Sequence, residues 1–201
     1  PRAAPPAATV RPADRAAATP RRRTAPSGVS SRACAAQGSG LSSAGREVTV
    51  RLSDRLTAEL VLIDPEVADR DALLRLYGSI FARAGIFADG GEVARRLLER
   101  ERVLSTGIGG GIAVPHAQVP GLGRLAIAAS THPSGLPYPA VDEQPVRLTF
   151  CLIGDSTTAA DHLAGLARLA RLARRSEFVE GLIGALNADD FLAHRARPEG
   201  E

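Results

Sequence analysis

The spacing of apolar residues predicts five amphipathic helices. Between residues 69 and 85, large apolar side chains recur every three or four positions, which is the period of one helix face; they are Leu73, Leu76, Tyr77, Ile80 and Phe81. Gly85 follows the last turn of this pattern and is expected to cap the helix at its C-terminus. Similar spacing predicts further helices over 91–103, 157–175, 176–186 and 188–196. In the 157–175 helix, Thr158 is the expected N-cap and Asp161 the acid of a capping box.

Apolar runs of strand length separate these helices. They predict strands over 111–117, 124–131 and 146–154. An earlier short strand fits either 46–52 or 58–65. Helices followed by three strands and then by more helices indicate an α/β fold, a three-layer α/β/α sandwich with a mixed central sheet.

Composition limits what fills the core and which chemistries are available. The chain has 201 residues, enough for one domain with a core, and is 44% hydrophobic but only 3% aromatic. Leu, Ile, Val and Ala must therefore fill most of the interior. There is no lysine, and all 25 basic residues are arginine. This excludes a phosphate-binding P-loop of the usual kind and Schiff-base catalysis, both of which need lysine.

Charge divides the chain near residue 46. Residues 1–46 hold eight arginines and one acid, a net of +7, whereas the remainder holds 17 arginines and 21 acids, a net of −4. The first part is rich in Pro, Ala, Arg, Ser and Gly, so we expect a disordered tail over 1–46 and a folded domain over 47–197. Its composition also resembles an organelle transit peptide, and a misplaced start is a further alternative.

The basic charge of this tail does not make the folded domain a nucleic-acid binder. With a net charge of −4, the core is expected to bind no nucleic acid. Binding through the arginines of the tail is a weaker hypothesis that deletion of residues 1–46 would test.

Two further features bear on the compartment and on metal binding. Cys34 and Cys151 lie far apart and form no CxxC pair, so neither a metal site nor a disulfide framework is expected. Cys151 stands inside an apolar run and is expected to be buried. The longest apolar runs fall short of a membrane span, so we expect no membrane insertion and a soluble, cytoplasmic protein.

The segment STGIGGGIAVPHAQ, residues 105–118, is the strongest candidate for a functional site. Gly107, Gly109, Gly110 and Gly111 are followed closely by Pro115, which fixes the backbone directly before His116. The glycines would let another molecule or a phosphate approach the backbone. The residues themselves leave two interpretations open, a tight turn with an idle histidine or a site built around His116.

The other three histidines are expected in different environments. His162 falls in the first turn of the 157–175 helix, on the same stripe as Leu166 and Leu169, so it is either a core residue or a side chain poised at an anion-favouring helix N-terminus. His132 is expected in a loop after a strand. His194 is expected to be solvated.

Several motifs in order resemble one protein family. STGIGGGIAVPHAQ resembles the active-site segment of enzyme IIA components of the fructose–mannitol type in the bacterial phosphoenolpyruvate-dependent phosphotransferase system. That pattern reads approximately S-T-G-(I/L)-G-(N/E)-G-(I/V)-A-(I/V)-P-H-G. Upstream, LLERERVLSTG resembles the family helix with an Arg-Glu pair, here Arg100 and Glu101. Downstream, YPAVDEQPVRLTFCLIG resembles the family's approach to a central strand. The segment ADHLAGLARLARLARR resembles the family helix that carries the second histidine, here His162. The resemblance covers about residues 47–195.

The resemblance implies a phosphoryl carrier of the EIIA type-2 class. His116 would accept a phosphoryl group from the phosphohistidine of the carrier HPr and pass it on, usually to a cysteine of an enzyme IIB. His162 and Arg100 would stabilise the phosphoryl oxygens. Ser105 or Thr106 would donate a hydroxyl hydrogen bond, and Gly109 and Gly111 would belong to the same phosphate- or partner-binding segment. No metal and no cofactor is implied.

The sequence departs from the family pattern beside the histidine. Gly110 stands where the family usually has Asn or Glu, Ala117 where it has Gly, and Gln118 where Lys is frequent. These changes put partner preference and transfer rate in question. A single domain with no IIB or membrane IIC portion favours the nitrogen-related regulatory branch over a sugar-specific one. The competing hypothesis is a regulatory binding module that kept the IIA fold and lost phosphotransfer.

Overall fold

The computed structural model describes residues 55–196. The predicted tail over 1–46, the candidate strand over 46–52 and Cys34 lie outside these residues and stay predictions. In chain order the described elements are η2 (Ala58–Leu60), β1 (Val61–Ile63), α1 (Arg70–Arg83), α2 (Gly90–Val103), β2 (Gly107–Gly109), β3 (Ile112–Ala113), β4 (His116–Gln118), β5 (Ala126–Leu136), β6 (Val146–Gly154), η3 (Ser156–Thr158), α3 (Ala159–Leu172), α4 (Ser176–Ile183) and α5 (Ala188–Ala196).

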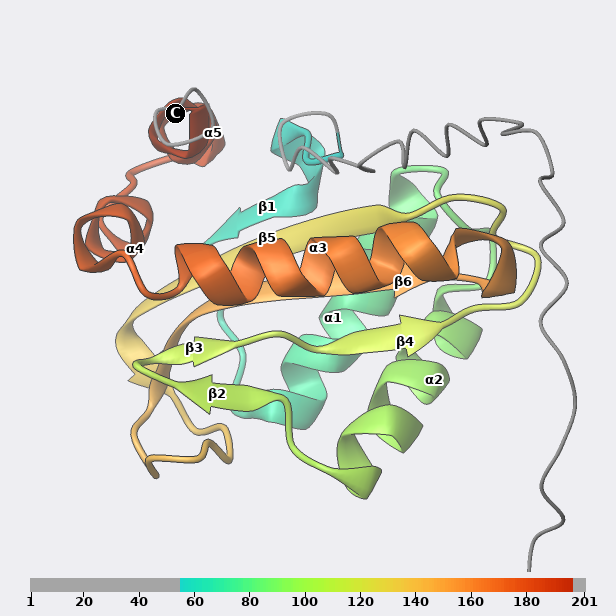
Figure 1. Ribbon diagram of the computed structural model, residues 1–201, viewed down its shortest axis with the longest axis horizontal. Coiled ribbons are helices and arrows are strands. Elements are labelled where there is room, and N and C mark those ends of the chain that lie inside the picture. Colours follow the sequence, from blue (N-terminus) through green and yellow to red (C-terminus); the bar gives the residue numbers. More distant parts are fainter. Residues whose placement is uncertain (1–54, 197–201) are drawn as a thin grey trace, which may run out of the picture. The chain divides into compact units, whose positions relative to one another are not determined.

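The strands form one mixed sheet (Figure 1). Its order is β1-β5-β6-β3-β2, and β4 also pairs with β6. β1 runs parallel to β5, β5 antiparallel to β6, and both β3 and β4 parallel to β6. The central strand β6 is buried along nearly its whole length, as expected for a strand covered on both faces.

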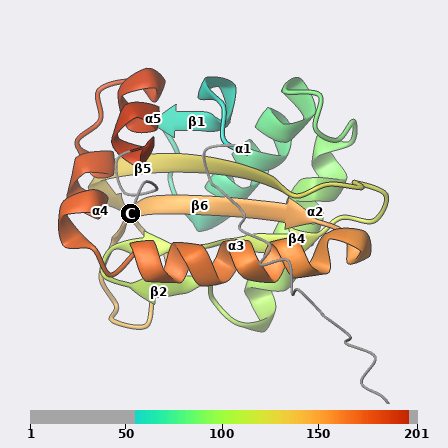
Figure 2. The same ribbon diagram turned by 45° about the horizontal axis from the view of Figure 1, so that its top comes forward.

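Helices cover both faces of this sheet. Leu148 and Phe150 of β6 surround a small internal cavity together with residues of α3 and α4, and Phe150 also lies near Phe191 of α5. On the opposite face, Thr149 of β6 is hydrogen-bonded to Tyr77 of α1. Figure 1 shows α3 in front of the sheet with α1 and α2 behind it, and Figure 2 shows the same layers from another angle. The predicted three-layer α/β/α arrangement with a mixed sheet is confirmed.

The predicted strand over 111–117 is instead two strands, β3 and β4, separated by Val114 and Pro115. Both lie along the same side of β6, where Ile112 is opposite Leu148 and His116 is opposite Leu152. Proline has no N–H to donate to a ladder, so the strand is interrupted there. The short strand β2, which pairs with β3 in a hairpin, was not predicted because glycine occupies two of its three positions.

The sequence predicted a cap at the C-terminus of α1 and another at the N-terminus of α3. Gly85 follows α1 with a φ of 64°, the left-handed conformation expected of a C-terminal cap. Thr158 is the N-cap of α3 as predicted, but its side chain makes no capping hydrogen bond to α3, and the predicted capping box with Asp161 is wrong. Asp155 caps instead, accepting from the Thr157 N–H at 3.0 Å, while the Asp155 N–H donates to Thr158 Oγ1 at 2.9 Å. The reason is the short η3 turn before α3, which moves the first unpaired N–H groups toward Asp155.

His132 lies inside β5 and is 4% exposed, so its prediction as a loop residue is wrong. Its Nε2 is 2.8 Å from Ser130 Oγ, which lies 2.7 Å from Thr149 Oγ1 and 2.9 Å from the Tyr77 hydroxyl. These side chains form a buried polar network between the sheet and α1. The strand continues through Pro133 to Leu136.

Acid should destabilise the fold through His132. Burial lowers the pKa of this imidazole to about 4, against the opposing influence of Asp64, whereas it titrates near 6.5 in an unfolded chain. The unfolded state therefore binds a proton first, and the free energy of unfolding should fall by up to about 3 kcal/mol as the pH drops from about 6.5 to about 4.

Urea unfolding of the wild type and His132→Gln at several pH values tests this. In His132→Gln the free energy of unfolding should depend less steeply on pH between about 6.5 and about 4 than in the wild type. The control His194→Gln should show the same pH dependence as the wild type. An equal pH dependence of the unfolding free energy in the wild type and His132→Gln would contradict the role given to His132.

Candidate active site

His116 begins β4 at an open edge of the sheet. On one side it is paired with Leu152 of β6. On the other side, β2 reaches only β3, with Gly107 opposite Ala113. Within residues 55–196 no strand covers the outer edge of β4. The imidazole of His116 is half-buried.

A hydrogen bond to the backbone fixes the tautomer of His116. Its Nδ1 lies 2.9 Å from the carbonyl oxygen of Val114. A carbonyl oxygen can only accept, so Nδ1 carries the proton and Nε2 keeps its lone pair in the neutral ring. Burial lowers the pKa of His116, the Val114 hydrogen bond opposes this, and the charge of Arg100 lowers it again while that of Glu101 raises it. The net lowering keeps the imidazole neutral, and thus nucleophilic, at neutral pH.

His162 lies beside His116. The two ring centroids are 5.6 Å apart and the rings meet edge to face at 71°. Burial, and secondarily the proximity of His116, lowers the pKa of His162 to about 4. Gly154 leaves room for the ring, since a Cβ there would lie 3.1 Å from His162 Nδ1. Of the two interpretations of His162, the structure favours the side chain poised beside the site over the core residue.

Arg100 approaches from the opposite helix. It stands in the last turn of α2, and its Nη1 donates to the carbonyl oxygen of Leu104 at 2.9 Å. This anchors one arm of the guanidinium at the C-terminal end of α2 and leaves its other N–H groups as donors.

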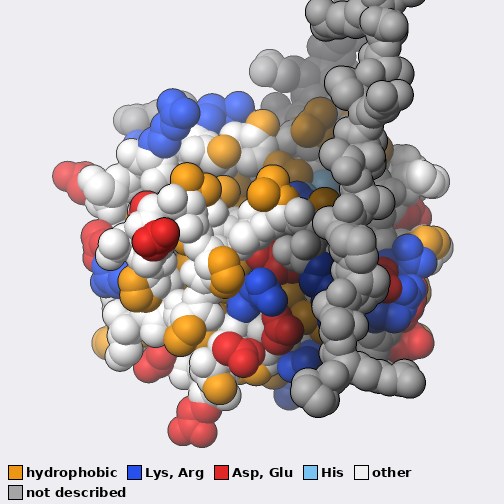
Figure 3. Space-filling model, turned by 90° about the horizontal axis from the view of Figure 1, so that it is seen from below, with side chains coloured by type: hydrophobic (Ala, Val, Ile, Leu, Met, Phe, Trp, Pro, Cys, Tyr) orange, Lys and Arg blue, Asp and Glu red, His pale blue; other side chains and the backbone are white. Residues whose placement is uncertain are grey.

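A groove of about 680 Å³ joins these groups. It is lined by residues of α2, β4 and α3: Arg96, Glu99, Arg100, Val103, His116, Ala117, Gln118, Ala159, His162, Leu163 and Leu166. Val103 and Leu163, which line the groove, and Leu104, which follows Val103, expose 70% or more of their surface to solvent. Figure 3 shows hydrophobic side chains interspersed with both signs of charge on the side where α2 and β2 run in Figure 1.

The comparison with known families gives one match that spans most of the described chain. The model of the phosphoenolpyruvate-dependent sugar phosphotransferase system, EIIA 2, matches residues 55–194. The chain belongs to this EIIA 2 family. The resemblance inferred from the histidine segment is thereby confirmed.

Relatives come from both branches of the family. The chain is 29% identical over 143 residues to the fructose-specific EIIABC component of Bacillus subtilis. The aligned region makes up 71% of this chain but only 22% of that protein. It is 28% identical over 141 residues to a nitrogen regulatory protein of Pseudomonas aeruginosa, covering 70% of this chain and 91% of that one. The crystal structure of nitrogen regulatory protein IIA-Ntr from Neisseria meningitidis superposes with a TM-score of 0.66 at 26% identity, covering 71% and 97% of the two chains.

Ser105 and Thr106 are placed differently from the two histidines. Both hydroxyls donate to the carboxylate of Glu101, Ser105 Oγ at 2.7 Å and Thr106 Oγ1 at 2.6 Å. Thr106 is buried, and neither residue lines the groove. A direct contact of either hydroxyl with a phosphoryl group stays a prediction.

Gly109 ends β2, and Gly111 lies in the hairpin turn between β2 and β3. Gly109, Gly110 and Gly111 all have positive φ, which explains glycine at each. The Gly110 N–H donates to Asp142 Oδ2 at 2.8 Å, so part of the turn is held by a carboxylate. The turn is five residues before His116 and supplies no residue to the groove. The glycines thus shape the hairpin, and a role in contacting a partner stays a prediction.

Sequence reasoning missed Arg96 and Val103 as groove residues. The signal was available, because they lie four residues before and three after Arg100 and so share its helix face. Leu163 was missed for a different reason, since only the placement of α3 beside β4 brings it to the groove.

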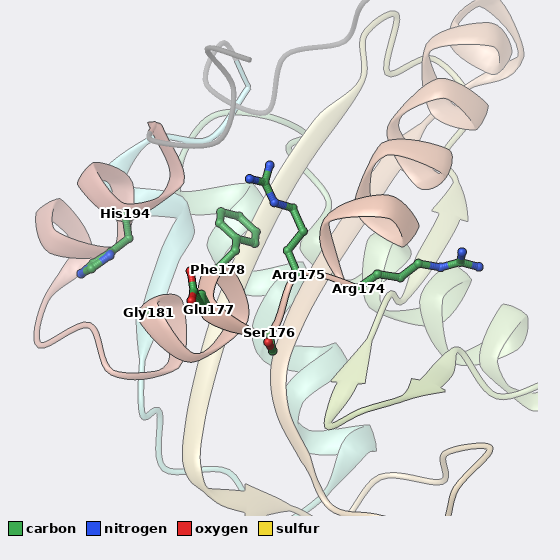
Figure 4. Close-up of a pocket in the computed structure, with 7 residues that line it drawn as sticks. All are labelled: Arg174, Arg175, Ser176, Glu177, Phe178, Gly181 and His194. Atoms are coloured by element: carbon green, nitrogen blue, oxygen red, sulfur yellow. The ribbon is translucent and has the colours of Figure 1, made fainter.

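A second cavity, of about 520 Å³, lies beside α4 and α5 (Figure 4). It is lined by Arg174, Arg175, Ser176, Glu177, Phe178, Gly181 and His194, none of which lines the groove. His194 is half-buried, with Nε2 3.7 Å from Asp190 Oδ1, so the prediction of a solvated residue is wrong in part. Figure 4 shows Arg174 directed away from the other labelled side chains.

Residues 55–196 contain neither a membrane-spanning helix nor a metal-binding cluster. No described helix is long and apolar enough to cross a bilayer. Over the same residues, no three His, Cys, Asp or Glu side chains are grouped so as to hold a metal ion. Cys151 is fully buried as predicted, and burial raises the pKa of its thiol.

Replacing Arg100 by alanine should raise the pKa of His116. The positive charge of Arg100 disfavours a second positive charge on the ring, so its removal makes protonation easier. NMR titration of His116 in the wild type and Arg100→Ala measures the shift. Arg95→Ala is the matched control, because Arg95 carries the same charge on the same helix but does not line the groove. An unchanged or lower pKa in Arg100→Ala would contradict the assignment.

Proposed function

We propose that this protein is a phosphoryl carrier that is phosphorylated on Nε2 of His116. The observation that carries the proposal is the hydrogen bond from His116 Nδ1 to the Val114 carbonyl, which leaves Nε2 as the only ring nitrogen with a free lone pair. The family match supports the same chemistry, because its EIIA proteins belong to a phosphotransferase system.

The transfer needs no water, metal or cofactor. The Nε2 lone pair of neutral His116 attacks the phosphorus of a phosphohistidine on the donor, and a P–N bond forms as the donor P–N bond breaks. The bonding electron pair returns to the donor nitrogen. The proton on Nδ1 of His116 stays in its hydrogen bond to Val114. Because one P–N bond replaces another, transfer is close to reversible and depends mainly on positioning and charge stabilisation.

Arg100 and His162 provide that stabilisation from two sides of the groove. The guanidinium is planar and permanently charged, and it retains N–H donors beyond the one bonded to Leu104. His162, neutral because its pKa is about 4, can donate one N–H to a phosphoryl oxygen. The 5.6 Å between the centroids of the two rings supports this role.

The partners are an HPr-type phosphocarrier as donor and an enzyme IIB or a regulatory target as acceptor. The exposed apolar side chains of Val103, Leu104 and Leu163 near the groove suit a protein partner that docks face to face. Of the two branches, we favour the nitrogen-related regulatory one, with the protein acting in the cytoplasm. The match to the nitrogen regulatory protein of Pseudomonas aeruginosa, which spans 91% of that protein, supports this choice.

Phosphorylation by phosphoenolpyruvate, enzyme I and HPr tests the proposal. The wild type should acquire acid-labile, alkali-stable phosphate, and His116→Ala should acquire none. Arg100→Ala and His162→Ala should still fold but accept phosphate more slowly, by about tenfold to about a thousandfold, as expected for the loss of one charge-stabilising donor.

A folded wild type that takes no phosphate from a donor system active on other IIA proteins would contradict the proposal. That result would favour the regulatory binding module that kept the fold and lost phosphotransfer. Transfer from the phosphorylated protein to a purified fructose-type enzyme IIB would, by contrast, move the assignment to the sugar-specific branch.

A further inference from the structure

Glu101 is a buried carboxylate that the proposed transfer does not use. It follows Arg100 on α2, but it is 3% exposed and does not line the groove. A carboxylate at such a position is costly unless its oxygens accept several hydrogen bonds. Glu101 accepts three, from Ser105 Oγ at 2.7 Å, from the Thr106 N–H at 3.0 Å and from Thr106 Oγ1 at 2.6 Å.

These bonds attach the segment after α2 to the helix itself. The hydroxyl proton of Thr106 is donated to Glu101, so the hydroxyl of Tyr138, 2.8 Å away, donates to Thr106 Oγ1. The proton of Ser105 has a second acceptor in the Pro139 carbonyl at 2.6 Å. Thr106 is therefore held through its N–H and on both sides of its hydroxyl, which fixes the position of its peptide group.

From Thr106 a short path of hydrogen bonds leads to the reacting ring. The Val114 N–H donates to the Thr106 carbonyl oxygen at 3.0 Å. The carbonyl oxygen of the same Val114 accepts from His116 Nδ1 at 2.9 Å. Val114 lies in the gap between β3 and β4, where it belongs to neither strand. The hydrogen bond from the Val114 N–H to Thr106 therefore helps to fix the backbone of Val114.

We propose that Glu101 is a positioning residue: by holding Thr106 against α2, it fixes Val114 and so keeps His116 in the tautomer and orientation that leave Nε2 free. The inference rests on the proposed function for its consequence in transfer. It gives Ser105 and Thr106 a role in holding the carboxylate, distinct from contact with phosphate.

The test compares Glu101→Gln with a pair of variants at Thr106. Glu101→Gln keeps the size of the side chain but turns an amide N–H₂ toward groups that themselves donate. Thr106→Val removes the hydroxyl and leaves the charge of Glu101 in place, and Thr106→Ser restores the hydroxyl. Glu92→Gln is the control, because Glu92 is a half-buried carboxylate on the same helix whose partners are arginines.

The first readout is the tautomer of His116, measured by ¹⁵N NMR in the unphosphorylated protein. The wild type, Thr106→Ser and Glu92→Gln should show one form with Nδ1 protonated. Glu101→Gln and Thr106→Val should show a mixture with the form protonated on Nε2. A merely structural role, which would lower the melting temperature alone, does not predict this change.

The second readout is the rate of phosphorylation. Glu101→Gln and Thr106→Val should lower kcat between about tenfold and about a hundredfold, as expected for a misplaced reacting atom, with KM for the donor within about twofold of wild type. Ser105→Ala should have a smaller effect, because Ser105 makes no backbone bond to Val114.

Each outcome decides the inference. An unchanged tautomer and kcat in folded Glu101→Gln would overturn it, as would a rise in KM alone. If Glu101→Gln does not fold, a wild-type tautomer and kcat in Thr106→Val would overturn it just as well. If the wild type accepts no phosphate, the proposed function fails, while the tautomer comparison still decides the role of Glu101.

Discussion

The interruption between β3 and β4 is the constraint on which the site depends. Pro115 has no N–H to donate at this point. The Val114 N–H donates to the Thr106 carbonyl rather than to β6, and the Val114 carbonyl accepts from the imidazole two residues later. The ladder resumes at once, since Leu152 donates to the Pro115 carbonyl at 2.9 Å. His116 is thus held by the sheet on one side and open to the groove on the other.

The electrostatic environment of this edge favours neutral imidazoles. Burial lowers the pKa of both His116 and His162, and each ring also has a positive or titratable neighbour that disfavours a further charge. A neutral His116 is the nucleophilic form, and Arg100 supplies permanent charge without competing for the proton. The groove therefore separates the two tasks of accepting a phosphoryl group and compensating its charge.

Two buried polar clusters support the fold in different ways. The network of Tyr77, Ser130, Thr149 and His132 lies between α1 and the sheet and joins β5 to β6. The cluster around Glu101 instead joins α2 to the segment that leads to His116. The first connects elements of the core, whereas the second connects an element of the core to the reacting residue.

The sequence alone predicted the helices and the α/β class, and it singled out His116, His162 and Arg100, which the structure brings to one groove. Apolar periodicity records which face of a helix is buried, and the Arg-Glu pair and the Gly-rich segment are local in sequence. It did not determine that 111–117 is broken into two strands, or that His132 is buried in β5, because both depend on the register with β6. Nor did it show that the hydroxyls of Ser105 and Thr106 turn to Glu101. Only the tertiary structure decided these, because hydrogen-bond partners and burial are set by residues distant in sequence, as when α3 brings His162 to within 5.6 Å of His116.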